Sequence, residues 1–158
     1  MARHFQGAVD RHNYYRALHG APRLMWSPEL AYDAAAYAVV AAKNYHAGRG
    51  LQHARNLQLL DQGENLAAGH ASAEEAVDSF YSEVELYNYY KPGFSTITGH
   101  FTQVVWQGST QIGIAEVDRV YVFRYRPAGN VCGTFQDNVL PPDFRAPSPM
   151  AVRRRQAY

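Results

Sequence analysis

Apolar residues recur at helical spacing near the start of the chain. This first segment carries the apolar or semi-apolar positions Phe5, Ala8, Val9, Tyr15 and Leu18. Gly20 and Pro22 then interrupt the pattern. The spacing predicts one helix from about Phe5 to Leu18.

A second helix has a clear start signal. Ser27 suits an N-cap, Pro28 suits the first helical position, and Glu29 places an acid in the first turn. One apolar stripe follows at Leu30, Ala34, Ala38, Ala41 and Tyr45. We expect this helix to end near His46, before Gly48.

The middle of the chain mixes weak and strong helical signals. Residues 51–69 show little periodicity, so we expect a short helix and loop there. Ser72 and Glu75 then form a capping box. A stripe of Val77, Phe80, Val84 and Tyr87 predicts a third amphipathic helix. A short fourth helix is expected over 101–105.

The period then changes to that of strands. Alternating apolar residues in 112–117 and 120–123 flank the pair Asp118-Arg119, which predicts a strand, a tight turn and a strand. Residues 138–140 suit a last edge segment. Helices followed by an antiparallel sheet predict an α+β domain with helices packed on the sheet.

Composition limits the class of protein. The 158 residues fit one domain, which we place at residues 1–144 with a loose tail at 145–158. Hydrophobic residues make up 47% of the chain and charged residues 18%, as expected for a folded protein. The net charge of +1 argues against nucleic acid as a partner.

Two features bear on location. Cys132 is the only cysteine, so no intramolecular disulfide can form, and a reducing compartment is favoured. The first residues lack the apolar run of a signal peptide, and Ala2 is incompatible with N-myristoylation of the chain as written.

Four polar residues stand at or near element boundaries, where a fold can gather side chains without burying charge in its core. They are His53, Glu64, Glu83 and His100. Two imidazoles and two carboxylates can hold a divalent metal, or can work as an acid/base set in which each carboxylate fixes a histidine tautomer.

Four sequence motifs, in order along the chain, carry a family resemblance. They are His12-Asn13-Tyr14-Tyr15-Arg16, Gly63-Glu64-Asn65-Leu66, residues 99–106 (GHFTQVVW) and residues 121–130 (YVFRYRPAGN). Together they resemble the CAP superfamily of cysteine-rich secretory, antigen and pathogenesis-related proteins. The resemblance covers roughly residues 5–142.

The resemblance implies a three-layer α-β-α sandwich with a central antiparallel sheet and a cleft above it. It also implies that His53, Glu64, Glu83 and His100 form the cleft tetrad of the family, with Glu83 favoured over Glu85. A zinc cofactor is then expected on these four residues. Asn13 and Arg16 instead fit a structural role, in which they tie the first helix to neighbouring loops.

One branch of the family is favoured. Phe123 stands where many secreted members carry cysteine, and the chain is most similar to the Golgi-associated, intracellular branch. That resemblance implies the cytoplasm or the cytosolic face of Golgi membranes, with peripheral membrane contact. The alternative is a secreted protein whose signal peptide is absent from this chain.

An aromatic segment resembles the loop through which some CAP proteins are thought to bind sterols. Its aromatic residues are Tyr87, Tyr89 and Phe94, beside a Pro92-Gly93 turn. Flat rings on a turn can form a shallow apolar surface for a flat lipid. We therefore expect a sterol or similar lipid as the ligand.

Three functions stay open at this point. The first is a lipid carrier that uses the aromatic loop. The second is a metal-dependent hydrolase, with metal on His53 and His100 and with Glu64 or Glu83 as the base. The third is a non-catalytic module that dimerises and recruits partners through the cleft rim. No residue is assigned a catalytic role, because the fold does not decide among the three.

Overall fold

The computed structural model describes residues 2–143 of the protein. The predicted tail at residues 145–158 lies outside the described residues. The elements in chain order are a 3₁₀ turn Ala2–Phe5, α1 Gln6–Leu18, β1 Met25–Trp26, α2 Pro28–Asn44, a wide helical turn Tyr45–Arg49, α3 Leu57–Leu60, β2 Gly63–Ala68, α4 Ala73–Ser82, a 3₁₀ turn Glu83–Leu86, α5 Gly99–Val104, β3 Gln111–Val117, β4 Val120–Arg126 and α6 Phe135–Asn138.

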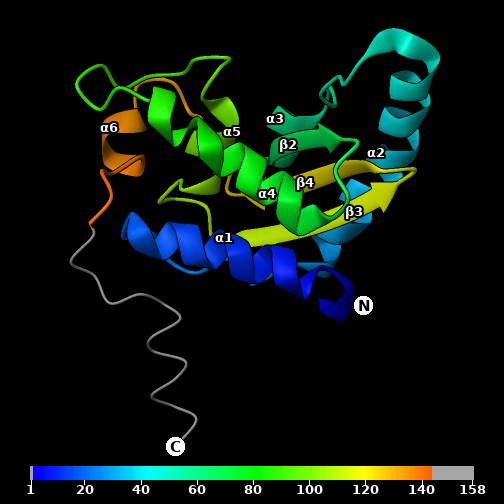
Figure 1. Ribbon diagram of the computed structural model, residues 1–158, viewed down its shortest axis with the longest axis horizontal. Helices are drawn as coiled ribbons and strands as arrows, with labels where there is room; N and C mark the ends of the chain where they lie inside the picture. The colour runs from blue at the N-terminus through cyan, green and yellow to red at the C-terminus, as the bar shows by residue number, and fades with distance from the viewer. Residues whose placement is uncertain (1, 144–158) are drawn as a thin grey trace, which may run out of the picture.

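The strands form one sheet in the order β1-β3-β4-β2. β4 pairs antiparallel with both β3 and β2, and only the two-residue β1 runs parallel to its neighbour β3. α2 covers one face of this sheet, while α1, α4 and α5 lie on the other (Figure 1). The predicted three-layer α-β-α sandwich is confirmed.

Local sequence signals explain where the long helices begin. The Ser27 hydroxyl accepts the backbone N–H of Leu30 at 3.2 Å, and the Ser72 hydroxyl accepts that of Glu75 at 3.1 Å. Gly113 lets α2 lie close on β3, since an added Cβ there would come within 2.2 Å of the Ala31 nitrogen. Capping and this close approach together fix α2 against the sheet.

Apolar side chains pack on both faces of the sheet. The larger core lies under α1, α4 and α5 and includes Phe101, Trp106 and Phe123. The smaller core joins the buried alanines of α2 to Leu66 and Val122. The inner stripe of α2 is therefore made of small side chains.

Buried polar residues tie α1 to the loops, as predicted for Asn13 and Arg16. The Asn13 side chain donates to the Leu24 carbonyl and accepts the Leu24 N–H. The Arg16 guanidinium, which is fully buried, donates to the backbone carbonyls of Pro22, Val104, Trp106 and Ser109. One cation thus joins the loop after α1 to the end of α5 and the loop that follows it.

The structure corrects the sequence prediction in three places. The third predicted helix, whose apolar stripe ran to Tyr87, ends at Ser82, and Glu83–Leu86 form a 3₁₀ turn. Residues 51–69 hold a strand, β2, as well as the short α3, and the polar pair Glu64-Asn65 had hidden the strand pattern. Residues 138–140 form no strand: Asn138 ends the short α6, whose backbone accepts the N–H of Gln107 at 3.0 Å. Val139 is buried, and it lies directly after the end of α6 rather than in an edge strand.

A helix that crosses a bilayer is long and apolar. Within residues 2–143, none of the helices combines the length and the apolar character that crossing a membrane requires.

Candidate functional site

Glu64 lies on β2, and its side chain is fully buried. Its carboxylate is held by three donors from outside this strand. One carboxylate oxygen lies 2.8 Å from the His53 Nδ1 and also accepts the Ala54 backbone N–H at 3.2 Å. The other oxygen accepts Nε–H of Arg124 at 2.7 Å. The side chain of His53 is 60% exposed, so a buried carboxylate holds an imidazole at the surface.

Arg124, which the sequence reasoning did not select, neutralises this buried carboxylate. It also donates to the Gln62 side chain at 2.8 Å, and its guanidinium carbon lies 5.4 Å from the centre of the Tyr37 ring. One signal pointed to it: a cation inside the apolar strand Val120–Arg126 requires a buried partner.

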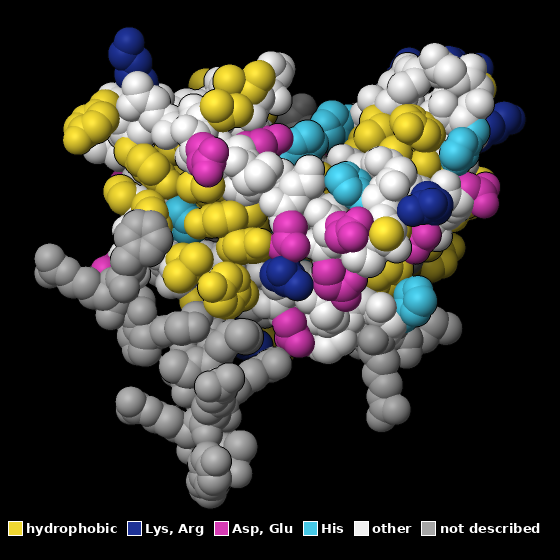
Figure 2. All heavy atoms as spheres, viewed as in Figure 1, with side chains coloured by type: hydrophobic (Ala, Val, Ile, Leu, Met, Phe, Trp, Pro, Cys, Tyr) yellow, Lys and Arg dark blue, Asp and Glu magenta, His cyan; other side chains and the backbone are white. Residues whose placement is uncertain are grey.

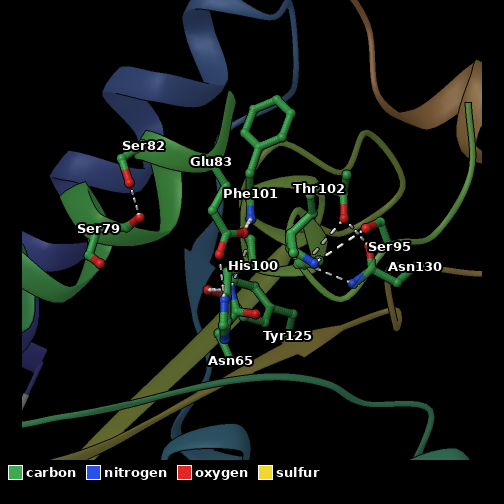
Figure 3. A network of polar contacts seen from close by, with 12 residues as sticks. Asn65, Ser79, Ser82, Glu83, Ser95, His100, Phe101, Thr102, Tyr125 and Asn130 are labelled. Carbon is green, nitrogen blue, oxygen red and sulfur yellow. Dashed lines mark hydrogen bonds and ion pairs between the residues drawn. The ribbon is translucent and has the colours of Figure 1, made fainter. Parts of the chain in front are cut away.

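Glu83 holds the second imidazole at the end of α4. Its two oxygens lie 2.8 Å from the His100 Nδ1 and 3.0 Å from the Phe101 nitrogen, which donates. The His100 ring also stacks on Phe80, with centroids 4.9 Å apart. Figure 3 shows the Glu83 carboxylate between the His100 ring and the Phe101 backbone. Glu85 is exposed, and it is Glu83 that contacts His100.

The four predicted residues therefore form two histidine–carboxylate pairs. Strand alternation turns Glu64 toward the α2 face and its neighbour Asn65 toward the α1 face. Asn65 joins the two pairs, because its side chain donates to the His100 carbonyl at 3.1 Å. Among residues 2–143, no group of three or more His, Cys, Asp or Glu side chains is placed to hold a metal ion.

Each pair has the form of a metal ligand with its supporting carboxylate. When a neutral ring donates its Nδ1–H to the carboxylate, its Nε2 keeps a lone pair that can bind a metal. This is the arrangement by which carboxylates orient metal-binding histidines in proteins. Glu64 and Glu83 thus stand behind the two imidazoles and orient them.

A buried hydrogen-bond chain connects His100 to α1. Asn65 donates to the Tyr125 hydroxyl at 3.3 Å, and this hydroxyl lies 2.7 Å from the His12 Nε2. The His12 Nδ1–H donates to the Ala8 carbonyl at 2.8 Å. Burial lowers the pKa of His12 to about 4, so its Nε2 is free to accept the Tyr125 proton.

The aromatic segment after α4 is divided between core and surface. Tyr87 is buried against Phe101, and Tyr89 packs beside it with a centroid distance of 4.9 Å. Burial raises the pKa of Tyr89 to about 12. Phe94 instead is well exposed. The structure thus does not bring the three predicted rings onto one exposed surface.

Other apolar side chains of the same segment complete an exposed surface with Phe94. Between 58% and 97% of each is exposed in the set Leu86, Tyr90, Phe94 and Ile97, which we call the apolar loop surface. Hydrophobic side chains gather on the part of the molecule that carries this loop (Figure 2). Sequence reasoning missed Leu86, Tyr90 and Ile97, because an irregular loop has no period that separates inner from outer positions.

The apolar loop surface reaches the histidine–carboxylate pair on α5. An added Cβ on Gly99 would come within 2.8 Å of the Phe94 ring, so this ring lies over the residue that precedes His100. Local bonds shape the loop, including the Lys91 N–H to the Asn88 carbonyl at 3.1 Å. The loop and the His100–Glu83 pair are neighbours, but they present different chemistry.

Comparison with known sequences agrees with these motifs. The model of the cysteine-rich secretory protein family, CAP, matches residues 9–118. Protein PRY2 of Saccharomyces cerevisiae is 40% identical over 140 residues, and the match covers 84% of this chain and 40% of that protein. The human Golgi-associated plant pathogenesis-related protein 1 is 38% identical over 143 residues, covering 85% of this chain and 90% of that protein.

Other relatives are longer than this chain. Secreted protein RBT4 of Candida albicans is 39% identical over 137 residues, which are 82% of this chain and 36% of that protein. The chain thus spans well under two thirds of several relatives that it matches.

Solved structures show the same fold at low identity. The structure described as NaASP2 with Zn²⁺ matches with a TM-score of 0.59 and 20% identity, covering 84% of each chain. The venom allergen-like protein 4 of Schistosoma mansoni matches with a TM-score of 0.60 and 18% identity, covering 87% of this chain and 94% of that one. At these identities the likeness concerns the fold.

Proposed function

Because the chain belongs to the cysteine-rich secretory protein (CAP) family, we propose that it binds a sterol or a similar flat lipid on the apolar loop surface. One observation carries the proposal: four large apolar side chains stand exposed within residues 86–97. Such a concentration of exposed apolar side chains on a folded domain marks a site where something apolar binds.

The loop is built to present these side chains. Tyr87 and Tyr89 pack against the core and hold the loop backbone in place, while Tyr90 and Phe94 are exposed to solvent. A preorganised surface loses little conformational entropy on binding. The residues that we expected to touch the lipid therefore divide into two anchors, Tyr87 and Tyr89, and one contact, Phe94.

Lipid binding should depend on the exposed rings and not on the cleft. Covering apolar surface contributes roughly 25 cal/mol per Å², so the double change Tyr90→Ala and Phe94→Ala should weaken binding about tenfold or more. Radiolabelled sterol binding to the folded variants measures this. Leu59→Ala is the matched control, because Leu59 is an exposed apolar residue on α3.

Two outcomes of that experiment bear on the proposal. A cleft variant, His100→Ala, should bind sterol as the unmodified protein does. If the Tyr90/Phe94 variant also binds as the unmodified protein does, the apolar loop surface is not the lipid site.

A second candidate is a divalent-metal site at the cleft, favoured by the free Nε2 of His53 and His100. One structural neighbour is described as containing Zn²⁺. A bound metal would supply a Lewis acid at this position. Two imidazoles are fewer than the three protein ligands of common catalytic zinc sites, and residues 2–143 place no third ligand beside them, so no hydrolytic step is assigned.

Zinc affinity should fall when either imidazole, or the carboxylate behind it, is changed. We expect His53→Ala and His100→Ala each to weaken zinc binding in calorimetry, and Glu83→Gln to weaken it about 10- to 100-fold, because Glu83 orients His100. His70→Ala is the matched histidine control. Unchanged affinity in both imidazole variants would remove the site.

The cellular location is part of the proposal. The similar proteins include one named for the Golgi and one named as secreted. The single Cys132 favours the first setting, because secreted domains commonly use disulfides. We therefore place the protein in the cytoplasm or at the cytosolic face of Golgi membranes, where a lipid ligand is within reach.

A further inference from the structure

Helix α2 is apolar on two opposite sides. Every residue from 34 to 42 is alanine, valine or tyrosine. The inner side, with Ala34, Ala38 and Ala41, packs on the sheet. The outer side faces away from the rest of the domain (Figure 1). A helix that is apolar all round is normally covered on all sides, and here only one side is covered.

The outer side carries large exposed side chains in one line. Between 49% and 76% of each is exposed in the set Tyr32, Val39 and Val40. With Ala36 and the charged ends Glu29 and Lys43, they form what we call the α2 seam. Its spacing of three and four residues places all members on one side of the helix.

We propose that the α2 seam is a homodimer interface, in which α2 packs antiparallel against α2 of a second copy around a two-fold axis at Ala36. The small Ala36 at the centre lets the two helices approach closely. Positions equally distant from Ala36 then meet across the axis. Such a contact uses the same patch on both copies, as two-fold dimers do.

The charges at the two ends of the seam select this partner and this direction. In the antiparallel arrangement Glu29, seven residues before Ala36, meets Lys43 of the second copy, seven residues after it. A parallel arrangement would bring like charges together. Glu29 also contacts Arg126 at 3.2 Å, but its side chain is 70% exposed and can face Lys43 as well.

The largest apolar side chain of the seam has an apolar partner in the same register, whereas Val39 meets Asp33, whose carboxylate also accepts from the Gln62 side chain. Tyr32 lies four residues before Ala36 and Val40 four residues after, so the ring of one copy meets the valine of the other. A large side chain thus faces a medium one on both sides of the small centre. This alternation suits helix packing by ridges and grooves.

Shallow hollows flank the seam on both sides. One, of about 490 Å³, lies between α2 and the β3–β4 turn, with Val39 and Val117 in its lining. The other, of about 250 Å³, lies between α2 and α3, with Val40 and Leu60 in its lining. They give the side chains of a second helix space beside the ridge.

A lipid surface fits the seam less well than a second copy does. A helix that lies on an anionic membrane carries several basic residues along its apolar side. The seam has one acid at one end and one base at the other. These two charges are complementary to those of a second, antiparallel copy. Because they cancel, they give no net attraction to an anionic surface.

Sedimentation equilibrium over a wide concentration range tests the dimer. We expect a monomer–dimer equilibrium in the unmodified protein, and Ala36→Glu should raise the dissociation constant more than tenfold. Ala36 is exposed, so this variant should fold, as circular dichroism can verify. Tyr90→Glu, on the apolar loop surface, is the matched control and should leave the dimer unchanged.

A charge exchange tests the register independently. Glu29→Lys and Lys43→Glu should each weaken self-association, because both charge pairs of each variant's own dimer become like-charged. An equal mixture of the two variants should restore dimers, since the introduced lysine of one variant then faces the introduced glutamate of the other, and the two unchanged residues also meet as opposite charges. A protein that stays monomeric at all concentrations, or dimers that tolerate Ala36→Glu, would overturn the proposal. Lack of recovery in the mixture would overturn the antiparallel register.

Discussion

Replacing Arg16 with methionine should remove about 3 to 5 kcal/mol from the free energy of unfolding. The guanidinium is fully buried and donates to four backbone carbonyls at 2.7 to 3.0 Å. Methionine fills part of the space but donates nothing, so these carbonyls lose their charged donor. The Trp106 carbonyl keeps the Ser109 N–H as a donor, and each of the other three, left without a partner, costs about 1 kcal/mol or more. Since burial lowers the pKa of Arg16 only to about 10, the cation is fully present at neutral pH.

Urea unfolding of Arg16→Met and Arg11→Met measures this difference on one helix. Arg11 pairs with Asp78 at 3.0 Å on the surface, where an ion pair contributes at most about 1 kcal/mol. We expect Arg11→Met to stay within that value. Equal losses in the two variants would show that Arg16 does not hold the loops together.

Acid should destabilise the protein through His12. Burial lowers the pKa of His12 from 6.5 to about 4 in the folded state. The unfolded chain therefore binds the proton more readily than the folded one. The stabilising effect of the neutral ring is complete above pH 6.5 and is lost as the pH falls toward 4. The difference corresponds to about 3 kcal/mol.

Unfolding free energies at about pH 7 and about pH 4.5 measure this effect, since these values lie on either side of the range in which the unfolded chain takes up the proton. His12→Gln should be less stable at neutral pH but should lose less stability on acidification than the unmodified protein. Some acid sensitivity should persist, because burial also lowers the pKa of His19. An unchanged pH dependence in His12→Gln would contradict the assignment to His12.

Helix starts could be read from the sequence because their causes are local. Ser27 and Ser72 each satisfy a backbone donor three residues on, which the residue types alone predict. β2 could not be read in this way. Glu64 and Asn65 interrupt its apolar pattern, and their partners Arg124 and Tyr125 lie 60 residues away in the chain. Residues 63–68 form a strand because they pair with a strand that is distant in the sequence.

The cleft residues could be named from motifs, but their arrangement could not. Glu64 and Glu83 each point to their own histidine because donors from β4 and α5 fix their second oxygens. The aromatic segment shows the same limit. Tyr87 and Tyr90 have similar chemistry, and only packing against Phe101 decides which of them is buried.

Photochemical labelling with a diazirine sterol analogue tests the lipid proposal most directly, because it reports which residues touch the lipid. Peptide mass spectrometry would locate the label on the folded, unmodified protein. We expect saturable labelling within residues 86–97, centred on Tyr90 and Phe94, that unlabelled sterol prevents. Saturable labelling confined to another surface, or no saturable labelling at all, would contradict lipid binding at the apolar loop surface.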